Sequence, residues 1–262
     1  MLANIHLPAS AAEAAGLLEG GGWLLGGGTL VMPRVNTGAV PVDTLISLRA
    51  AGLDGVRVAD GLAEVGAAVT LARLGEHEEL AFLRPVVRSI ASPPVRNLAT
   101  VGGNLFATQP HGDLAVALLA LGARVDVLST GGARTIDVGE AVAHNEVVTT
   151  VHFGLPKVWR YRKAMRRKHN SASIVTVAAA LVVTGGVVEQ ATIALGGVAS
   201  TPVRANAAEQ ALIGRPLDLA AAEAAAAAAH EGTAPFDDAY ASAWYRARVL
   251  PVHVRRALLG ED

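Results

Sequence analysis

The order of hydrophobic and polar residues along the chain predicts short strands and helices in mixed succession. Residues 9–20, "ASAAEAAGLLEG", have the apolar spacing of a helix, with Ser10 as a candidate N-cap and Gly20 to Gly22 as its end. The apolar runs "WLLGG" and "VDTLIS" predict two short strands that flank a glycine-rich turn. In residues 55–74 the alternation is typical of a hairpin whose turn is Asp60–Gly61.

The middle of the chain combines an interrupted helix, a second glycine-rich segment and a further helix. Residues 84–95 begin with a helical pattern that we expect to break at Pro93 and Pro94, because proline lacks the backbone N–H and clashes with the preceding turn. Residues 97–113, "NLATVGGNLFATQPHGD", predict a second glycine loop. An apolar helix then occupies residues 113–122.

Beyond this helix the pattern changes to strands and then to helices. Residues 124–138 predict a hairpin turned by Gly131 and Gly132, and residues 173–199 predict a longer hairpin turned at Gly185–Gly186. Two helical stretches follow, and the alanine run "LAAAEAAAAAAHEG" predicts an ordinary helix because alanine is the best helix former. The amphipathic tail "SAWYRARVLPVHVRRALL" is the last helix. Strands followed by helices favour an α+β fold.

The chain changes character near Pro156, which sets the expected domain boundary. We expect residues 1–156 to form a domain of mixed strands and helices with two α/β subdomains that divide near residues 50–55. Residues 157–262 form a C-terminal domain in which helices pack on an antiparallel sheet.

Composition narrows the class of protein. The 262 residues are 52% hydrophobic and 17% charged, which provides for a packed core and shows no signature of disorder. A net charge of −1 disfavours a nucleic-acid or anionic-membrane partner. The absence of cysteine excludes disulfides and cysteine-ligated metal clusters within this chain. The start lacks the features of a signal peptide, and the longest apolar stretch, residues 172–183, is too short to span a membrane, so we expect a cytoplasmic protein.

The motifs point to a bound anion and give little support to side-chain catalysis. The eight histidines show no metal-binding spacing, and no nucleophile elbow, Walker loop or good dinucleotide fingerprint is present. Two glycine-rich segments lie about 75 residues apart, around Gly27 and Gly102. The first segment by itself favours a tight turn between strands. Two such loops that converge would bind a diphosphate through their backbone N–H groups.

The second segment resembles the FAD-binding subunit of the molybdenum hydroxylases, the family of the medium subunit of aerobic carbon monoxide dehydrogenase and the flavin domain of xanthine dehydrogenase. That family has a Thr-(Ile/Val)-Gly-Gly-(Asn/Asp) loop, then an aspartate, then a helix that ends in Leu-Gly-Ala. Here the corresponding stretches are "TVGGN" at residues 100–104, Asp113 and "LLALGA". The turn "GGGTLV" at residues 26–31 is similar to the family's first loop. "AEVGAAVTLARL", "YRKAMRRKHNSASIVTVAAALVV" and the closing stretches extend the resemblance over nearly the whole chain.

The resemblance implies that residues 1–156 bind FAD, and it assigns a set of residues to the cofactor. The implied residues are Leu25, Gly26, Gly27, Gly28, Thr29, Leu30, Ile90, Thr100, Gly102, Gly103, Asn104, Asp113 and Lys163. The two glycine segments would contact the pyrophosphate, Asp113 would accept from ribityl or ribose hydroxyls, and Ile90 and Lys163 would lie near the isoalloxazine. Leu30 departs from the family, which often has a polar residue there.

Two of these assignments have plainer alternatives. Asp113 could be the N-cap of the helix that follows it. Lys163 could be one charge in a solvated basic run, since six of the ten residues 160–169 are lysine or arginine. That run favours a surface that meets an acidic partner subunit over one that binds nucleic acid, because no aromatic platform lies beside it.

The implied function is that of the flavoprotein subunit of a molybdenum-containing dehydrogenase or hydroxylase. The resemblance implies that a large partner subunit carries the molybdenum cofactor, that a small iron–sulfur subunit carries two 2Fe–2S clusters, and that FAD on this chain passes electrons to an external acceptor. Two alternatives remain open: a stand-alone FAD oxidoreductase of the same fold, and a scaffold subunit that has lost its flavin.

Overall fold

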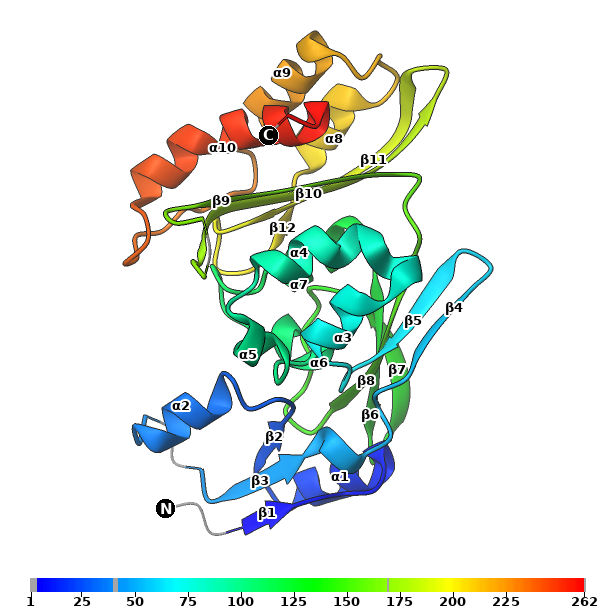
Figure 1. Ribbon diagram of the computed structural model, residues 1–262, viewed down its shortest axis with the longest axis vertical. Coiled ribbons are helices and arrows are strands. Elements are labelled where there is room, and N and C mark those ends of the chain that lie inside the picture. The colour runs from blue at the N-terminus through cyan, green and yellow to red at the C-terminus, as the bar shows by residue number, and fades with distance from the viewer. Residues whose placement is uncertain (1–3, 40–41, 169, 262) are drawn as a thin grey trace. The chain divides into compact units, whose positions relative to one another are not determined.

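The computed structural model describes residues 4–39, 42–168 and 170–261 of the chain (Figure 1). The chain forms two compact units, and each unit draws on separate stretches of the sequence. The first unit contains Met1–Ala81, Ser92–Ala107 and Ala123–Phe153. The second contains Phe82–Ala91, Thr108–Gly122 and Gly154–Asp262. Two helical segments from the middle of the chain therefore belong with the C-terminal sheet.

The first unit begins with a small parallel sheet. Its strands pair in the order β1 (Asn4–His6), β3 (Thr44–Ser47) and β2 (Trp23–Leu25). Helix α1 (Ala11–Glu19) joins β1 to β2, and its N-cap Ser10 accepts a hydrogen bond from the Glu13 N–H. The predicted helix, its cap and the two strands are confirmed. The expectation of a tight turn between the two strands is wrong, because β2 and β3 are parallel and a helix separates them. Helix α2 (Val31–Asn36) begins directly after the glycine-rich turn.

A five-stranded sheet forms the rest of the first unit. Its strands lie in the order β4 (Val56–Ala59), β5 (Leu62–Gly66), β8 (Val147–Gly154), β6 (Arg124–Ser129) and β7 (Gly132–Asp137). The two predicted hairpins are confirmed, and Asp60 and Gly61 both have positive φ at the turn between β4 and β5. Three short helices also belong to this unit: α3 (Leu71–Glu76), α5 (Pro93–Arg96) and α6 (Val101–Leu105).

The structure corrects two details of the middle of the chain. Helix α4 (Arg84–Ser89) ends before the prolines are reached, and Pro93 instead begins α5, where its missing N–H costs no helical hydrogen bond. The second glycine segment is not the loop that the sequence predicts, because Gly102 and Gly103 lie in the first turn of α6. The predicted apolar helix is confirmed as α7 (Asp113–Ala120).

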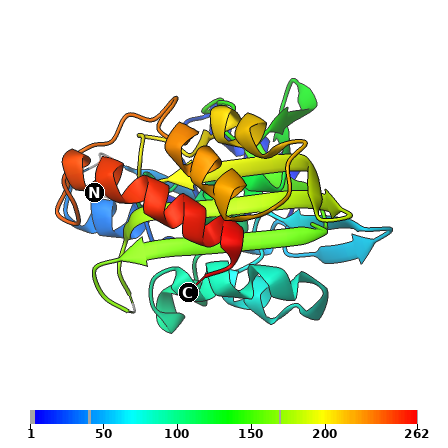
Figure 2. The same cartoon turned by 90° about the horizontal axis from the view of Figure 1, so that it is seen from above.

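The second unit is an antiparallel sheet covered by helices (Figure 2). Its strands lie in the order β12 (Val203–Arg204), β11 (Val187–Gly196), β10 (Ser173–Thr184) and β9 (Val158–Met165). Helices α8 (Asn206–Leu212), α9 (Leu219–Ala228) and α10 (Ala243–Leu259) follow, so the expectation of a sheet with packed helices is confirmed.

Strand β10 is buried on both faces, and its side chains alternate between two sets of helices. Val175, Val177 and Ala179 belong to the apolar core that includes residues of α8, α9 and α10. Ala178 instead packs with Val116 of α7. Because side chains two positions apart on a strand point to the same face, Thr176 lies with Ala178 on the α7 face.

Within the described ranges no helix is long and apolar enough to cross a membrane.

Candidate functional site

The first glycine segment is a tight turn between β2 and α2. Gly28 has φ of +73°, a conformation that side chains with a Cβ adopt rarely. No described residue accepts a hydrogen bond from the backbone N–H groups of residues 27–30. Leu30 is 44% exposed and provides no side-chain cap for α2, which is where a polar residue would have acted. The turn therefore presents a row of unpaired backbone donors.

The second glycine segment is the start of helix α6. Thr100 is its N-cap, and the Thr100 hydroxyl accepts a hydrogen bond from the Gly103 N–H at 3.1 Å. Thr100 and Asn104 are both buried. A single β-bridge joins Thr100 to Thr70, which ties the start of α6 to the start of α3. The side chain of Thr100 thus already has a structural task as a cap.

Close packing brings these two segments together within the first unit. A Cβ added at Gly26 would lie 2.6 Å from the Thr100 hydroxyl oxygen, and one added at Gly27 would overlap the carbonyl of Leu98. A Cβ at Gly102 would lie 2.8 Å from the Cβ of Ala67. Packing of the protein on itself therefore requires these glycines, independently of any ligand.

The donor set of the first turn fits the pyrophosphate of FAD. Consecutive backbone N–H groups that include a residue with positive φ form an anion-binding concavity, and here these groups have no acceptor in the part of the chain that the structure describes. The Gly103 N–H, in contrast, is already used by Thr100. Of the two segments, the first therefore has the larger number of available donors.

Asp113 lies in the second unit and is the first residue of α7. The N-cap is Gly112, which makes no side-chain cap bond, so the alternative that Asp113 caps this helix is wrong. The Asp113 carboxylate is 2% exposed and accepts from the Thr176 hydroxyl at 2.7 Å and from the Lys163 ammonium at 2.8 Å. Burial raises the pKa of Asp113, while Lys163 and the Thr176 hydrogen bond act to lower it.

Lys163 is not a solvated surface charge, so that alternative is also wrong. Its side chain is 3% exposed, and its ammonium donates to Asp113 and to the Ser89 carbonyl at 2.9 Å. Among the described residues the third ammonium N–H has no acceptor. Arg166, Arg167 and Lys168, the continuation of the same basic run, are exposed.

Ile90 also lies in the second unit, where it follows the last residue of α4. It is 6% exposed, and its backbone is extended. The next residue, Ala91, has φ of 44°, which is unfavourable for a residue with a Cβ. The Ser89 carbonyl, one residue before Ile90, accepts from Lys163. Ile90 is thus anchored next to the buried ion pair.

Three further residues surround Asp113 and Lys163 and were not predicted from the sequence. The Ser89 hydroxyl donates to the Val86 carbonyl at 2.7 Å and lies 2.8 Å from the Tyr161 hydroxyl. Because Ser89 has one hydroxyl hydrogen, Tyr161 is the donor to Ser89. Burial and the charge of Asp113 raise the pKa of Tyr161 well above its ordinary value, so the phenol keeps its proton. Thr176 is the third residue.

The sequence contains a signal for these residues. Tyr161 and Lys163 are two positions apart on β9, and Thr176 is the cross-strand partner of Lys163 on β10. Polar side chains at alternate positions of one strand, opposite a polar residue of a buried neighbouring strand, indicate a shared polar cluster. Reading that pattern requires the register between β9 and β10, which a single sequence does not provide.

The predicted residues therefore fall into two groups. The first unit brings together Leu25, Gly26, Gly27, Gly28, Thr29, Leu30, Thr100, Gly102, Gly103 and Asn104. The second unit brings together Ile90, Asp113 and Lys163.

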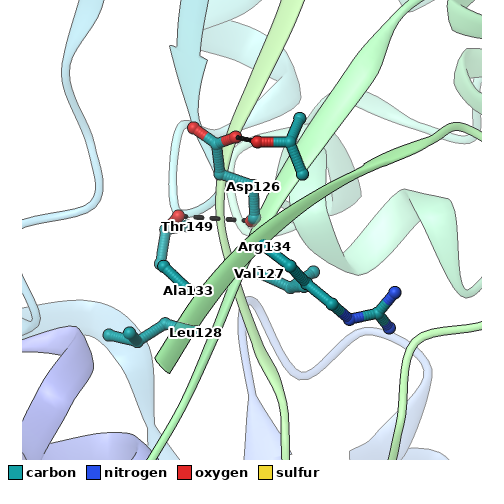
Figure 3. Close-up of a pocket in the computed structure, with 7 residues that line it drawn as sticks. Asp126, Val127, Leu128, Ala133, Arg134 and Thr149 are labelled. Atoms are coloured by element: carbon teal, nitrogen blue, oxygen red, sulfur yellow. Dashed lines mark hydrogen bonds between the residues drawn. The ribbon is translucent and has the colours of Figure 1, made fainter. Parts of the chain in front are cut away.

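A separate hollow on the five-stranded sheet holds none of the predicted residues (Figure 3). Its volume is about 380 Å³, and Asp126, Arg134 and Thr149 are among the residues that line it. Its charged groups already have partners: Asp126 accepts from Thr135, and Arg134 is paired with Glu146. Nothing in this hollow resembles a diphosphate site.

Comparison with known proteins defines the class of this protein, that of flavin-binding subunits. Residues 2–153 match the FAD-binding domain of molybdopterin dehydrogenases, and residues 159–260 match the C-terminal domain of carbon monoxide dehydrogenase flavoproteins. The chain belongs to this family and is an oxidoreductase subunit.

Individual relatives support the same assignment over almost the full length. The chain is 31% identical to the carbon monoxide dehydrogenase medium chain of Afipia carboxidovorans, with 97% of this chain and 95% of that protein covered. It is 28% identical to the putative xanthine dehydrogenase FAD-binding subunit of Escherichia coli, with 98% and 94% covered.

Solved structures show the same fold. A chain of the Cu,Mo-CO dehydrogenase superposes with a TM-score of 0.90 at 30% identity, with 99% of this chain and 98% of that chain covered. A chain of quinoline 2-oxidoreductase from Pseudomonas putida 86 gives a TM-score of 0.91 at 27% identity, with 99% and 96% covered. The mixed α+β fold expected from the sequence is therefore confirmed.

Proposed function

We propose that this chain holds FAD as the electron-transfer subunit of a multi-subunit molybdenum-containing dehydrogenase or hydroxylase. Electrons would arrive from iron–sulfur clusters on a partner chain and leave to an external acceptor. The observation that carries the proposal is the row of backbone N–H groups at residues 27–30 that have no acceptor among the described residues, in a turn packed against the start of α6. FAD, when bound, supplies the exchange between single-electron and two-electron transfer.

Each group of residues has its own task in this proposal. The turn at Gly26–Thr29 holds the pyrophosphate through backbone N–H groups, and the start of α6 with Gly102, Gly103 and Asn104 closes the phosphate site. Asp113 and Lys163 hold the ribityl chain and the isoalloxazine by hydrogen bonds, and Ile90 provides an apolar surface for the ring. These roles are supported by the donor set of the turn and by the buried, paired state of Asp113 and Lys163.

The proposed partner subunits would carry the metal centres for which this chain has no cysteine ligands. It contains no cysteine, so clusters ligated by cysteine have to reside on another chain. We propose a large subunit with the molybdenum cofactor and a small subunit with two 2Fe–2S clusters, in keeping with the multi-subunit relatives. Residues 1–156 would form the FAD-binding domain and residues 157–262 the C-terminal domain, a division supported by the two family matches.

The first test is chemical analysis of the purified chain. We expect a yellow protein that releases FAD on denaturation, because two segments around a diphosphate exceed what one phosphate requires. We also expect no oxidation of a purine, an aldehyde or carbon monoxide by the chain without its partners. Release of stoichiometric FMN would contradict the FAD assignment, and bleaching of the flavin by substrate in the isolated chain would favour a stand-alone oxidoreductase.

The second test is charge reversal at the phosphate site. Gly103→Asp should weaken FAD binding tenfold or more, since a carboxylate about 4 Å from a phosphate repels it by about 4 kcal/mol at an effective dielectric near 20, before screening. Residue 103 is the third residue of α6, where an acidic side chain favours the helix, so the variant should fold.

Gly103→Asn is the matched control for this test, because it has the same shape without the charge. It should bind FAD much more tightly than Gly103→Asp in a fluorescence titration. Equal FAD affinity of a folded Gly103→Asp variant and the parent would remove the second segment from the site.

A further inference from the structure

The buried ion pair of the second unit has a third member whose task is not explained by packing. Thr176 is fully buried, with 0% exposure, and its hydroxyl donates to Asp113 Oδ1 at 2.7 Å. Its neighbours on the same face of the sheet, such as Ala178 and Ala194, are apolar. A valine would fill the same space without a polar atom. The hydroxyl therefore serves the Asp113 carboxylate.

The two oxygens of the Asp113 carboxylate accept hydrogen bonds from different donors. Oδ1 accepts from Thr176 and Oδ2 accepts from Lys163, so each oxygen has one protein donor. Thr176 and Lys163 are directly opposite one another on β10 and β9. Both side chains consequently reach the same carboxylate from adjacent strands, and removal of one donor would leave Asp113 free to rotate.

We propose that Thr176 is a positioning residue for FAD, and that it acts by holding the Asp113 carboxylate ionised and oriented toward Lys163. This rests on the proposed function, in which Asp113 and Lys163 bind the flavin. With Asp113 held in place, the Lys163 ammonium is fixed by this carboxylate and by the Ser89 carbonyl, and its third N–H, which has no acceptor among the described residues, is available to the cofactor.

The charged and titratable groups around Asp113 agree with this role. Lys163 and Tyr161 come from β9, and His111 comes from the turn before α7. Lys163 and His111 favour the ionised carboxylate, and Tyr161 stays neutral. The Ser89 carbonyl at the end of α4 accepts a hydrogen bond from Lys163 and so acts on Asp113 only indirectly. On β11, residues near this site such as Ala194 are apolar. Thr176 is thus the neutral donor that supports ionisation of the carboxyl.

The sign of the pH dependence follows from the burial of Asp113. Burial raises the pKa of this carboxyl, and the Thr176 hydrogen bond opposes that rise. FAD affinity should fall as the pH drops through the pKa of Asp113. Loss of the Thr176 hydroxyl raises this pKa further, so the fall should begin at a higher pH.

The experiment compares Thr176→Val with Thr176→Ser in the full chain, with FAD titrated into deflavinated protein across a range of pH. Thr176→Val should raise the FAD dissociation constant about tenfold near neutral pH and move the midpoint of the pH profile upward by about one unit. Thr176→Ser keeps the hydroxyl and should restore both quantities to within about threefold of the parent.

A matched control and a double variant separate positioning from a general loss of structure. Ser173→Ala removes another fully buried hydroxyl of β10, one that donates to the Pro110 carbonyl, and should leave the pH midpoint unchanged. In an Asp113→Asn background, Thr176→Val should no longer move the pH profile of FAD binding, since the ionisable carboxyl through which it acts is gone.

The possible failures are distinguishable. A parent chain that binds no FAD at any pH would overturn the proposed function. A parent that binds FAD, with a Thr176→Val variant whose pH midpoint is unchanged or whose effect persists beside Asp113→Asn, would overturn the role of Thr176 alone.

Discussion

The glycine turn of the first unit and the buried ion pair of the second unit offer different chemical groups to the proposed cofactor. The turn presents backbone N–H groups, and its side chains are minimal because the Thr100 hydroxyl and the Leu98 carbonyl occupy the space where a Cβ of residue 26 or 27 would lie. The ion pair uses Asp113 and Lys163 side chains that are almost completely buried. Substitutions that add atoms should therefore disturb the glycine turn most. Substitutions that remove atoms should disturb the ion pair most.

The largest effect should come from an added methyl group in the turn. Gly27→Ala would place a Cβ against the Leu98 carbonyl, and backbone cannot move aside as a flexible side chain can. We expect a loss of about 4 kcal/mol or more in the free energy of unfolding, measured by urea denaturation. Gly16→Ala, at an open position within α1, is the matched control and should be neutral or stabilising by up to about 1 kcal/mol. Similar unfolding curves for both variants would contradict the close approach of the two segments.

A smaller but still large effect should follow removal of one partner of the ion pair. Asp113→Ala leaves the Lys163 ammonium buried without a counter-ion and should cost about 3 kcal/mol of stability. Lys163→Met should cost less, because Asp113 has a raised pKa and can take up a proton. The double variant should be more stable than Asp113→Ala by itself, as thermal unfolding of the three proteins would show. Strictly additive losses would mean that the two residues do not interact.

The smallest effects should come from substitutions at two residues with positive φ, one in each unit. Ala91 has φ of 44° and Gly28 has φ of +73°. Ala91→Gly should stabilise the protein by up to about 1 kcal/mol, because glycine adopts positive φ without steric cost. Gly28→Ala should destabilise it by about 1 kcal/mol or more, since its Cβ would also lie 3.1 Å from Met32. Changes of the same sign in calorimetry would show that φ does not control these positions.

Local sequence patterns determined most of the secondary structure. Ser10 as a cap, the Asp60–Gly61 turn and the ends of α7 follow from interactions within a few residues, and the structure confirms them. The error at residues 100–104 is instructive. Two adjacent glycines predict a loop, but the Thr100 cap and the packing of Gly102 on Ala67 stabilise a helical turn there. The Thr100 cap is local, but the contact with Ala67 comes from a residue remote in sequence.

What the sequence by itself determined was the family resemblance, the α+β class and the set of residues implied for FAD. Only the tertiary structure decided that Asp113 is not a cap, that Lys163 is buried, and that Ser89, Tyr161 and Thr176 surround them. The physical reason is that each of these facts depends on the register of β9 against β10 and on the packing of α7 and α4 on that sheet. Hydrogen bonds between residues 50 or more positions apart cannot be assigned from a single sequence, because the polar positions of β9 and β10 do not reveal the register between the two strands.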